Sequence, residues 1–124
     1  MPTNTVTGLS VKSLDEPEEK RQPAKSVIDI STVSDYTIGR FSFERGWSWS
    51  ESIKPVVKTE SCQNSHVGYC LAGTLEVQLT SGETATIKAG DTFAIPPGHD
   101  ARVVGDDNFV AIEFLSAATY AKPV

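Results

Sequence analysis

The sequence predicts an all-β domain, either a sandwich or a barrel, and three observations support this. Apolar and polar residues alternate in several short runs, as they do in strands with one buried face. Glycine and proline separate these runs, as turns between strands require. No window carries an apolar stripe with the period of an amphipathic helix. We therefore expect roughly seven or eight short strands.

The expected strands can be placed in order along the chain. The segment Ser26–Ile30 has strand character and is expected to pair with a sheet edge. The run Thr74–Thr80 alternates cleanly, and a turn at Ser81-Gly82-Glu83 leads into Thr84–Lys88, so these two runs predict a hairpin. The remaining strands are expected from β propensity and flanking turns at Tyr36–Phe43, Trp47–Glu51, His66–Leu71, Phe93–Ile95 and Phe109–Phe114.

Composition limits the classes of protein that this chain can belong to. Its 124 residues fit one domain, and 39% hydrophobic residues suffice for a core. A net charge of −5 argues against nucleic acid or an anionic membrane as a partner. There is no apolar run long enough to span a membrane, and the start lacks signal-peptide character. Two cysteines do not make a disulfide framework, so we expect a cytoplasmic protein with reduced thiols.

Charge divides the chain into two expected parts. Residues Lys12–Lys25 hold eight charged side chains, four of each sign, with two prolines. We therefore expect residues 1–25 to form a flexible charged N-terminal arm, with a short helical turn at Glu18–Arg21, and residues 26–124 to form the barrel. Removal of residues 1–22 should then leave the barrel folded.

Two segments resemble the conserved motifs of the cupin superfamily. One runs from His66-Val-Gly-Tyr-Cys to Gly73, and the other is Gly90-Asp-Thr-Phe-Ala-Ile-Pro96-Pro-Gly98-His99. The spacing of Gly90, Pro96 and Gly98 matches the second motif residue for residue. The resemblance covers about residues 36–115 and is closest to small single-domain cupins. It implies a double-stranded β-helix, also called a jelly-roll barrel.

The chain departs from the family at the positions that usually hold a metal ion. Counting back from Gly73, the family's glutamate falls on His66, and its two histidines fall on Glu60 and Cys62. The histidine of the second motif falls on Ala101. None of the four usual ligands therefore has its usual identity, although His99 lies only two residues before the last position.

The two histidines are nevertheless the best candidates for a site. We expect His66 and His99 to point inward near one end of the barrel. On a regular strand, Glu60, Cys62 and His66 would share one face. With His99 adding a second imidazole from the opposite strand, these four residues could bind Zn²⁺ or Fe²⁺. In the other reading, which the missing ligands favour, the histidines are hydrogen-bonded pocket residues, Cys62 is a small buried hydrophobe, and no metal is tightly bound.

Aromatic residues suggest a cavity for a small organic ligand. We expect Trp47 and Trp49 to share one strand face and to line the cavity, with Phe41 and Phe43 beside them. With His66, His99 and Cys62, they form the expected ligand-binding residues. The expected function is small-molecule binding, as a sensor or accessory protein. The alternatives are a metal-dependent isomerase, lyase or dioxygenase, and a structural dimerisation module.

The outward face of one strand carries Val67, Tyr69 and Leu71. Three apolar side chains in succession are unusual on a face exposed to water. We expect residues 26–35 or a second subunit to cover them. Because small cupins are often homodimers, the resemblance favours a homodimer.

Overall fold

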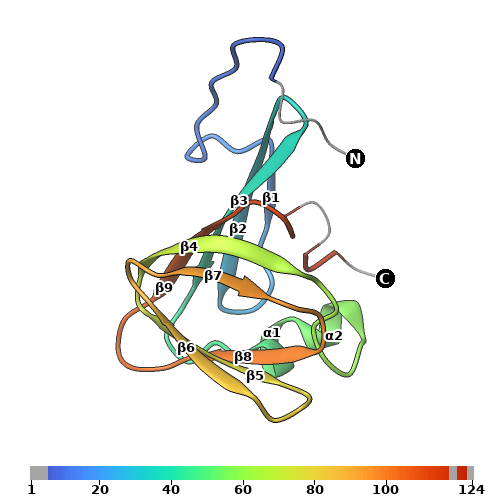
Figure 1. Cartoon of the computed structure of the whole chain (residues 1–124), viewed down its shortest axis with the longest axis vertical. Coiled ribbons are helices and arrows are strands. Elements are labelled where there is room, and N and C mark those ends of the chain that lie inside the picture. Colours follow the sequence, from blue (N-terminus) through green and yellow to red (C-terminus); the bar gives the residue numbers. More distant parts are fainter. Residues whose placement is uncertain (1–5, 118–119, 123–124) are drawn as a thin grey trace.

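The computed structural model describes residues 6–117 and 120–122, which form two antiparallel sheets (Figure 1). In spatial order, the larger sheet contains β1 (Glu19–Arg21), β2 (Ser26–Val33), β3 (Tyr36–Phe43), β9 (Phe109–Glu113), β4 (His66–Ala72) and β7 (Thr92–Ile95). The smaller sheet contains β6 (Thr84–Lys88), β5 (Thr74–Leu79) and β8 (His99–Val103). The short helices α1 (Trp49–Ser52) and α2 (Lys54–Val57) connect β3 to β4. The predicted all-β class is confirmed.

Alternation places one face of each inner strand in a shared core. Leu75 and Val77 of β5 are buried, and they belong to the expected hairpin with β6. Strand β9 buries its odd-numbered residues Phe109, Ala111 and Glu113. Its more apolar even-numbered residues are only half-buried, so the most hydrophobic face of this strand is not the core face. A carboxylate therefore lies on the inner side of the larger sheet.

The expected strand at Trp47–Glu51 is wrong, because α1 occupies most of it. Ser48 is the N-cap of α1, and its side chain accepts a hydrogen bond from the backbone N–H of Glu51. Before the helix, the Trp47 carbonyl accepts a hydrogen bond from Val103 of β8. Capping and this contact with a distant strand override the β propensity of the two tryptophans.

The expected helical turn at Glu18–Arg21 is also wrong. Residues Glu19–Arg21 form β1, which pairs with Ile28–Ile30 of β2. The Arg21 guanidinium donates hydrogen bonds to the Ala117 and Tyr120 carbonyls. The larger sheet therefore begins before residue 26, inside the segment expected to be an arm.

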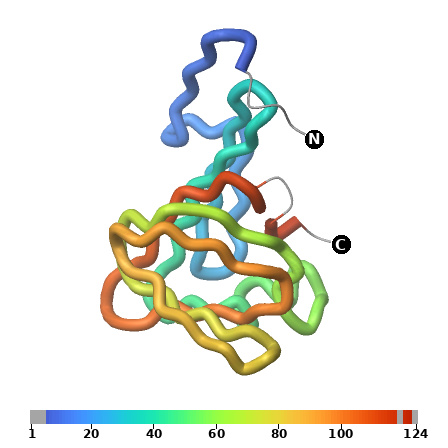
Figure 2. Tube along the Cα trace, in the orientation of Figure 1, coloured from blue at the N-terminus to red at the C-terminus, as the bar shows by residue number. Residues whose placement is uncertain are grey.

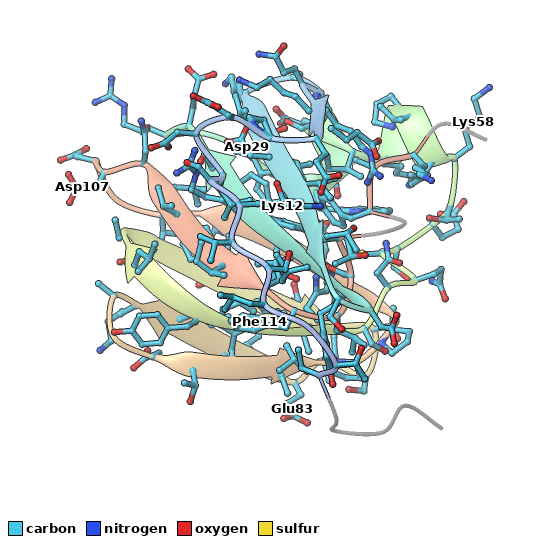
Figure 3. The ribbon with its side chains drawn as sticks, turned by 90° about the horizontal axis from the view of Figure 1, so that it is seen from above. Lys12, Asp29, Lys58, Glu83, Asp107 and Phe114 are labelled. Atoms are coloured by element: carbon cyan, nitrogen blue, oxygen red, sulfur yellow. The ribbon has the colours of Figure 1, made fainter. Side chains whose placement is uncertain are left out.

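The residues before β1 also contact the sheet. Arg40 of β3 donates hydrogen bonds to the Asp15 carboxylate, to the Leu14 carbonyl and to Asp29 of β2. Figure 2 shows this segment looping beyond one end of the barrel, beside the turn between β2 and β3. In Figure 3, Lys12 and Asp29 mark where the segment passes over these two strands. These polar contacts hold the segment across the outside of the sheet.

Gly73 joins β4 to β5 at a position where only glycine fits. Its φ is +78°, and an added Cβ would lie 2.3 Å from the Asn108 carbonyl oxygen. A residue with a side chain would be strained in this conformation and would collide with the backbone before β9. The turn therefore lets the chain pass from the larger sheet to the smaller one.

The apolar strip on the outer face of β4 remains exposed in the part of the chain that the structure describes. Val67, Tyr69 and Leu71 are 44%, 40% and 50% exposed, and Phe114 beside them is 51% exposed. The segment expected as a possible cover, residues 26–35, mostly forms β2 and pairs in the plane of the sheet with β3, so it does not cover the strip.

Neither helix in the described residues is long and apolar enough to cross a membrane.

Truncations test how far the fold extends towards the N-terminus. Removal of residues 1–11 should change the melting temperature little, because all the contacts of β1, Asp15 and Arg21 remain. Removal of residues 1–22 should destabilise the fold by about 1–3 kcal/mol, because it deletes β1 and leaves two carbonyls without the Arg21 guanidinium. Thermal melts of both truncated chains check this. Equal melting temperatures would show that β1 contributes nothing, as the sequence-based expectation implied.

Candidate functional site

A buried chain of hydrogen bonds lies at the inner surface of the larger sheet. The Nδ1 of His66, the first residue of β4, is 2.6 Å from Oε1 of Glu113, the last residue of β9. The Ser116 hydroxyl donates to the same carboxylate oxygen, also at 2.6 Å. All three residues are at most 5% exposed. The buried carboxylate is stabilised by these two hydrogen bonds, as a buried charged group requires. The bond to Nδ1 in turn fixes the orientation of the His66 ring.

Close packing between strands makes room for this carboxylate. Gly68 of β4 lies opposite Glu113 in the register of β4 and β9. A Cβ added to Gly68 would lie 2.4 Å from the Ile112 carbonyl oxygen and 3.1 Å from Cγ of Glu113. A larger residue here would push β9 away from β4 and disturb the hydrogen bond to His66.

Cys62 reaches His66 from a separate segment of the chain. Cys62 forms an isolated bridge with His99: its N–H donates to the His99 carbonyl, and its own carbonyl accepts from Gly98. Its Sγ lies 3.6 Å from Nε2 of His66. The possible ligand atoms of Cys62, His66 and His99 all lie within 4.8 Å of one another, and all three residues are buried.

His99 is oriented by the corner that precedes it. Its Nδ1 lies 2.7 Å from the Pro96 carbonyl oxygen. A carbonyl can only accept, so Nδ1 carries a proton and donates it to this bond, which leaves Nε2 as the ring nitrogen free to face the site. His66 also uses Nδ1 for its hydrogen bond to an oxygen, which leaves Nε2 facing Cys62. Both imidazoles therefore offer the same nitrogen to the site.

The electrostatics of Cys62 and His66 favour a charged pair. Burial tends to raise the pKa of Cys62, but hydrogen bonds to His66 and His99 and their charges lower this pKa to about 6. Burial tends to lower the pKa of His66, but its bonds to Cys62 and Glu113 and their negative charges raise this pKa to about 9. Near neutral pH the two groups form a thiolate and an imidazolium.

The two histidines line a small cavity inside the barrel. Its volume is about 20 Å³, close to what one water molecule needs. Aromatic rings fill most of the barrel around it: Trp47 stacks on Phe43 with centroids 3.8 Å apart, and Tyr120 packs 5.4 Å from His66. The lining residues are Phe41, Phe43, Trp47, Trp49, His66, Leu75, Phe93, Ile95, His99, Ala101, Phe109, Glu113 and Tyr120.

The structure brings together most of the residues expected from the sequence. His66, His99, Trp47 and Trp49 lie in the cavity lining, and Cys62 lies against His66 just outside it. Glu60 is not part of the group: its side chain is 98% exposed and pairs with Lys54 on the surface. The expected regular strand from Glu60 to His66 does not form, because β4 begins only at His66. The shared face predicted for Glu60 and Cys62 is therefore lost.

Sequence reasoning missed Glu113, Ser116 and Tyr120. Glu113 lies on the same face of β9 as Phe109 and Ala111, and this was the signal that could have identified it. The opposite face of the strand is more hydrophobic, so the sequence pattern favoured that face as the buried one. Ser116 and Tyr120 follow the last strand and carry no motif. Their role follows from tertiary contacts alone, since Ser116 bonds to Glu113 and the Tyr120 ring packs against His66.

Two antiparallel sheets around a histidine-lined cavity define a barrel of the double-stranded β-helix class. A family profile described as Cupin domain matches residues 54–115. The chain therefore belongs to the cupin family, which confirms the resemblance seen in the motifs. No functionally curated protein matches the chain.

Similar solved structures support the same fold. A protein of unknown function from Rhizobium leguminosarum is 20% identical with a TM-score of 0.62, over 88% of this chain and 98% of that one. KdgF from Halomonas sp. is 21% identical with a TM-score of 0.58, over 87% and 92%. Ectoine synthase from P. lautus is 16% identical with a TM-score of 0.61, over 86% and 78%. At these identities the likeness concerns the fold, and the neighbours differ in function.

The charged pair predicts an unusual titration of Cys62. In the metal-free C70S variant, thiolate absorbance in the ultraviolet should appear with a midpoint near pH 6, because His66 and His99 stabilise the thiolate. C62S in the same background should abolish this transition. A midpoint near the ordinary thiol value of about 8.5 would contradict the pairing.

The same pair should make stability depend on pH. Cys62 has a lowered pKa, so its contribution is present above its unfolded pKa and is lost as pH falls through about 6. His66 has a raised pKa, so its contribution is present below its unfolded pKa and is lost as pH rises through about 9. The contribution of the pair to melting temperature should therefore be greatest between these values, and smaller in C62S.

Proposed function

We propose that this chain is a small-molecule-binding cupin in which a transition-metal ion, held by Cys62, His66 and His99, meets the ligand. The main support is the orientation of the two imidazoles. Each is fixed through Nδ1 by an oxygen, so each presents Nε2 near the Cys62 sulfur. Such outer hydrogen bonds are the usual way in which metal-binding histidines are oriented.

The donor set suits zinc or ferrous iron. Borderline metal ions accept nitrogen and sulfur ligands together, and the low pKa of Cys62 supplies the thiolate that metal binding needs. His66 would lose its proton on binding the ion. With three protein ligands, the bound ion would act as a Lewis acid with a coordination position open to the small molecule.

The sequence positions of the three proposed ligands connect this proposal with the family. Cys62 stands where the cupin motif has its second histidine, and His66 stands where it has glutamate. Ala101 stands where the second motif has its histidine, and we propose that His99 supplies the imidazole instead. His99 lies two residues before Ala101 in β8, and both residues line the same cavity. The proposed centre therefore uses the same region of the barrel as the family motif, with a different donor set.

An enzyme of the isomerase, lyase or dioxygenase class is the second candidate. The observation that favours it is the hydrogen-bonded chain from Ser116 through Glu113 to His66, which could hold a proton beside the ligand. A sensor or accessory protein would release its ligand unchanged. Mass spectrometry of a ligand recovered after incubation with the metal-loaded protein separates these two functions.

Metal titration tests the proposed centre directly. Wild-type protein dialysed against Zn²⁺ should retain about one ion per chain by elemental analysis, and C62S or H99A should retain far less because each lacks a donor. E60Q is the matched control and should bind as well as wild type, because Glu60 lies outside the group. E113Q should weaken binding about 10–100-fold through the orientation of His66.

Two outcomes would contradict the proposed centre. The first is a wild-type protein that is folded but retains no metal after loading. The second is loss of metal in E60Q together with full binding in C62S, because this would place the ion on the surface. Co²⁺ gives an independent readout, since a thiolate-to-metal absorption band should appear in wild type and be missing in C62S.

We also propose that the chain works as a homodimer in a reducing compartment such as the cytoplasm. Cys62 and Cys70 are free and buried, in agreement with reduced thiols. The strip formed by Val67, Tyr69 and Leu71 adjoins the exposed Phe114, so the outer face of β4 and β9 offers apolar surface to a second subunit. Figure 3 shows Phe114 beside this face.

A charge placed in this strip tests the homodimer. Y69K should shift the protein from dimer to monomer in light scattering, because a buried ammonium without a partner costs on the order of several kcal/mol. T84K, on the exposed surface of β6, is the control and should leave the mass unchanged. A wild-type monomer, or a Y69K dimer as stable as wild type, would disprove this interface.

A further inference from the structure

The barrel has an open seam between β6 and β7. In the described residues, β6 pairs only with β5 and β7 only with β4, so each is the last strand of its sheet. Figure 1 shows the two strands diverging from a common turn. Strand β8, at the other side of the smaller sheet, is instead bridged by Ser48 and Cys62. The smaller sheet is therefore bridged at its β8 side to the segment between β3 and β4, whereas no strand pairing joins the two sheets at the β6–β7 side in the described residues.

A groove of about 330 Å³ occupies this seam. It is far larger than the inner cavity, and its floor contains apolar side chains of three strands. Glu83 and Asp91 are the charged residues of its lining, and Figure 3 shows Glu83 at the surface. The apolar lining residues are Val77, Leu79, Ala85, Ile87, Phe93, Ala94, Ile95 and Pro96.

Phe93 and Ile95 separate the groove from the inner cavity, since both residues line both spaces. Ile95 is buried, whereas Phe93 is only partly buried. The tip of the Phe93 ring lies over Gly68, where an added Cβ would be 2.8 Å from Cζ. Because Phe93 lines both spaces and is partly exposed, rotation of its ring would connect the groove with the cavity at His66 and His99.

The inner cavity sets limits on the group that enters it. Its volume of about 20 Å³ admits one heavy atom of a head group, or slightly more. In the metal-free protein an anion is disfavoured there, because no lysine or arginine lines the cavity and His66 is already paired with Glu113. The indole N–H groups of Trp47 and Trp49 are buried and make no hydrogen bond to the described residues. Buried donors of this kind need an acceptor, so an oxygen atom is favoured.

We propose that the β6–β7 groove binds the unbranched aliphatic tail of a ligand whose uncharged single-oxygen head, such as a hydroxyl, enters the inner cavity past Phe93. The inference rests on the proposed function, because it names the ligand of the same site. The acidic rim at Glu83 and Asp91 keeps an anionic head out of the groove as well. Tail and head therefore have separate surfaces, and Phe93 lies between them.

Binding of straight-chain 1-alkanols tests this, with the fluorescence of Trp47 and Trp49 as the readout. These are the two tryptophans of the chain, and both line the inner cavity. Affinity should rise about threefold to fourfold with each added methylene until the groove is full. Carboxylates of the same length should bind the metal-free protein much more weakly, because no lysine or arginine in the cavity lining compensates their charge.

Two variants locate the tail. A85E puts a charged side chain into the groove lining, on the face of β6 that also carries Ile87, and should remove the dependence on chain length. Q78E is the matched control, since Gln78 lies on the exposed face of the neighbouring strand β5 and does not line the groove. F93A should keep the dependence on chain length and speed binding, because the ring no longer separates the two spaces.

Several outcomes would overturn the inference. These are an affinity independent of chain length, equal binding of alkanols and carboxylates to the metal-free protein, and equal effects of A85E and Q78E. The titration is carried out on both metal-free and zinc-loaded protein. A chain-length dependence without zinc retention would disprove only the metal centre, whereas zinc retention without such a dependence would disprove only the groove.

Discussion

The hydrogen bond between His66 and Glu113 is the interaction on which the site depends. It joins the first residue of β4 to the last residue of β9 inside a barrel that is otherwise filled with aromatic and aliphatic side chains. A carboxylate in such surroundings would be unfavourable alone, and Ser116 and His66 supply its partners. The same bond fixes the His66 ring, and the negative charge of Glu113 helps to hold His66 protonated beside the Cys62 thiolate.

Segments outside the motifs close the end of the barrel. Arg21 of β1 is hydrogen-bonded to the carbonyls of Ala117 and Tyr120, and the Tyr120 ring packs on Phe41 and His66. The first strand and the last described residues thus stabilise each other over the site. Burial raises the pKa of Tyr120 well above its usual range, and the charges of Cys62, Glu113 and Asp100 act in the same direction. The phenol therefore stays neutral next to the charged pair.

The narrow interior changes the kind of ligand that this barrel suits. Stacked rings leave space for about one water beside the histidines, so an organic ligand can present only a small part of itself there. The open seam between the two sheets supplies the larger surface. In the binding mode that we propose, a barrel with an almost filled interior and an open side would recognise its ligand mainly outside the core, at the edge strands.

Local pattern determined the architecture. Alternation in β5, the turn into β6 and the Gly90–Gly98 motif depend on residues close together in sequence, and these parts match the structure. His66 and His99 were identifiable because they are the two histidines of the chain and belong to motif segments. Cys62 was chosen through its shared parity with His66, yet it reaches the site through a bridge to β8.

The tertiary structure alone decided the chemistry of the site. Glu113 joins His66 across 47 positions of sequence, and this contact exists only because β9 lies between β3 and β4. Glu60 points to solvent because the segment before β4 is not a strand, which no local pattern revealed. Trp47 and Trp49 reach the cavity around a helix that Ser48 caps. Sequence patterns define strands and turns because those depend on neighbouring residues, whereas the partners of a buried charge are set by the packing of distant strands.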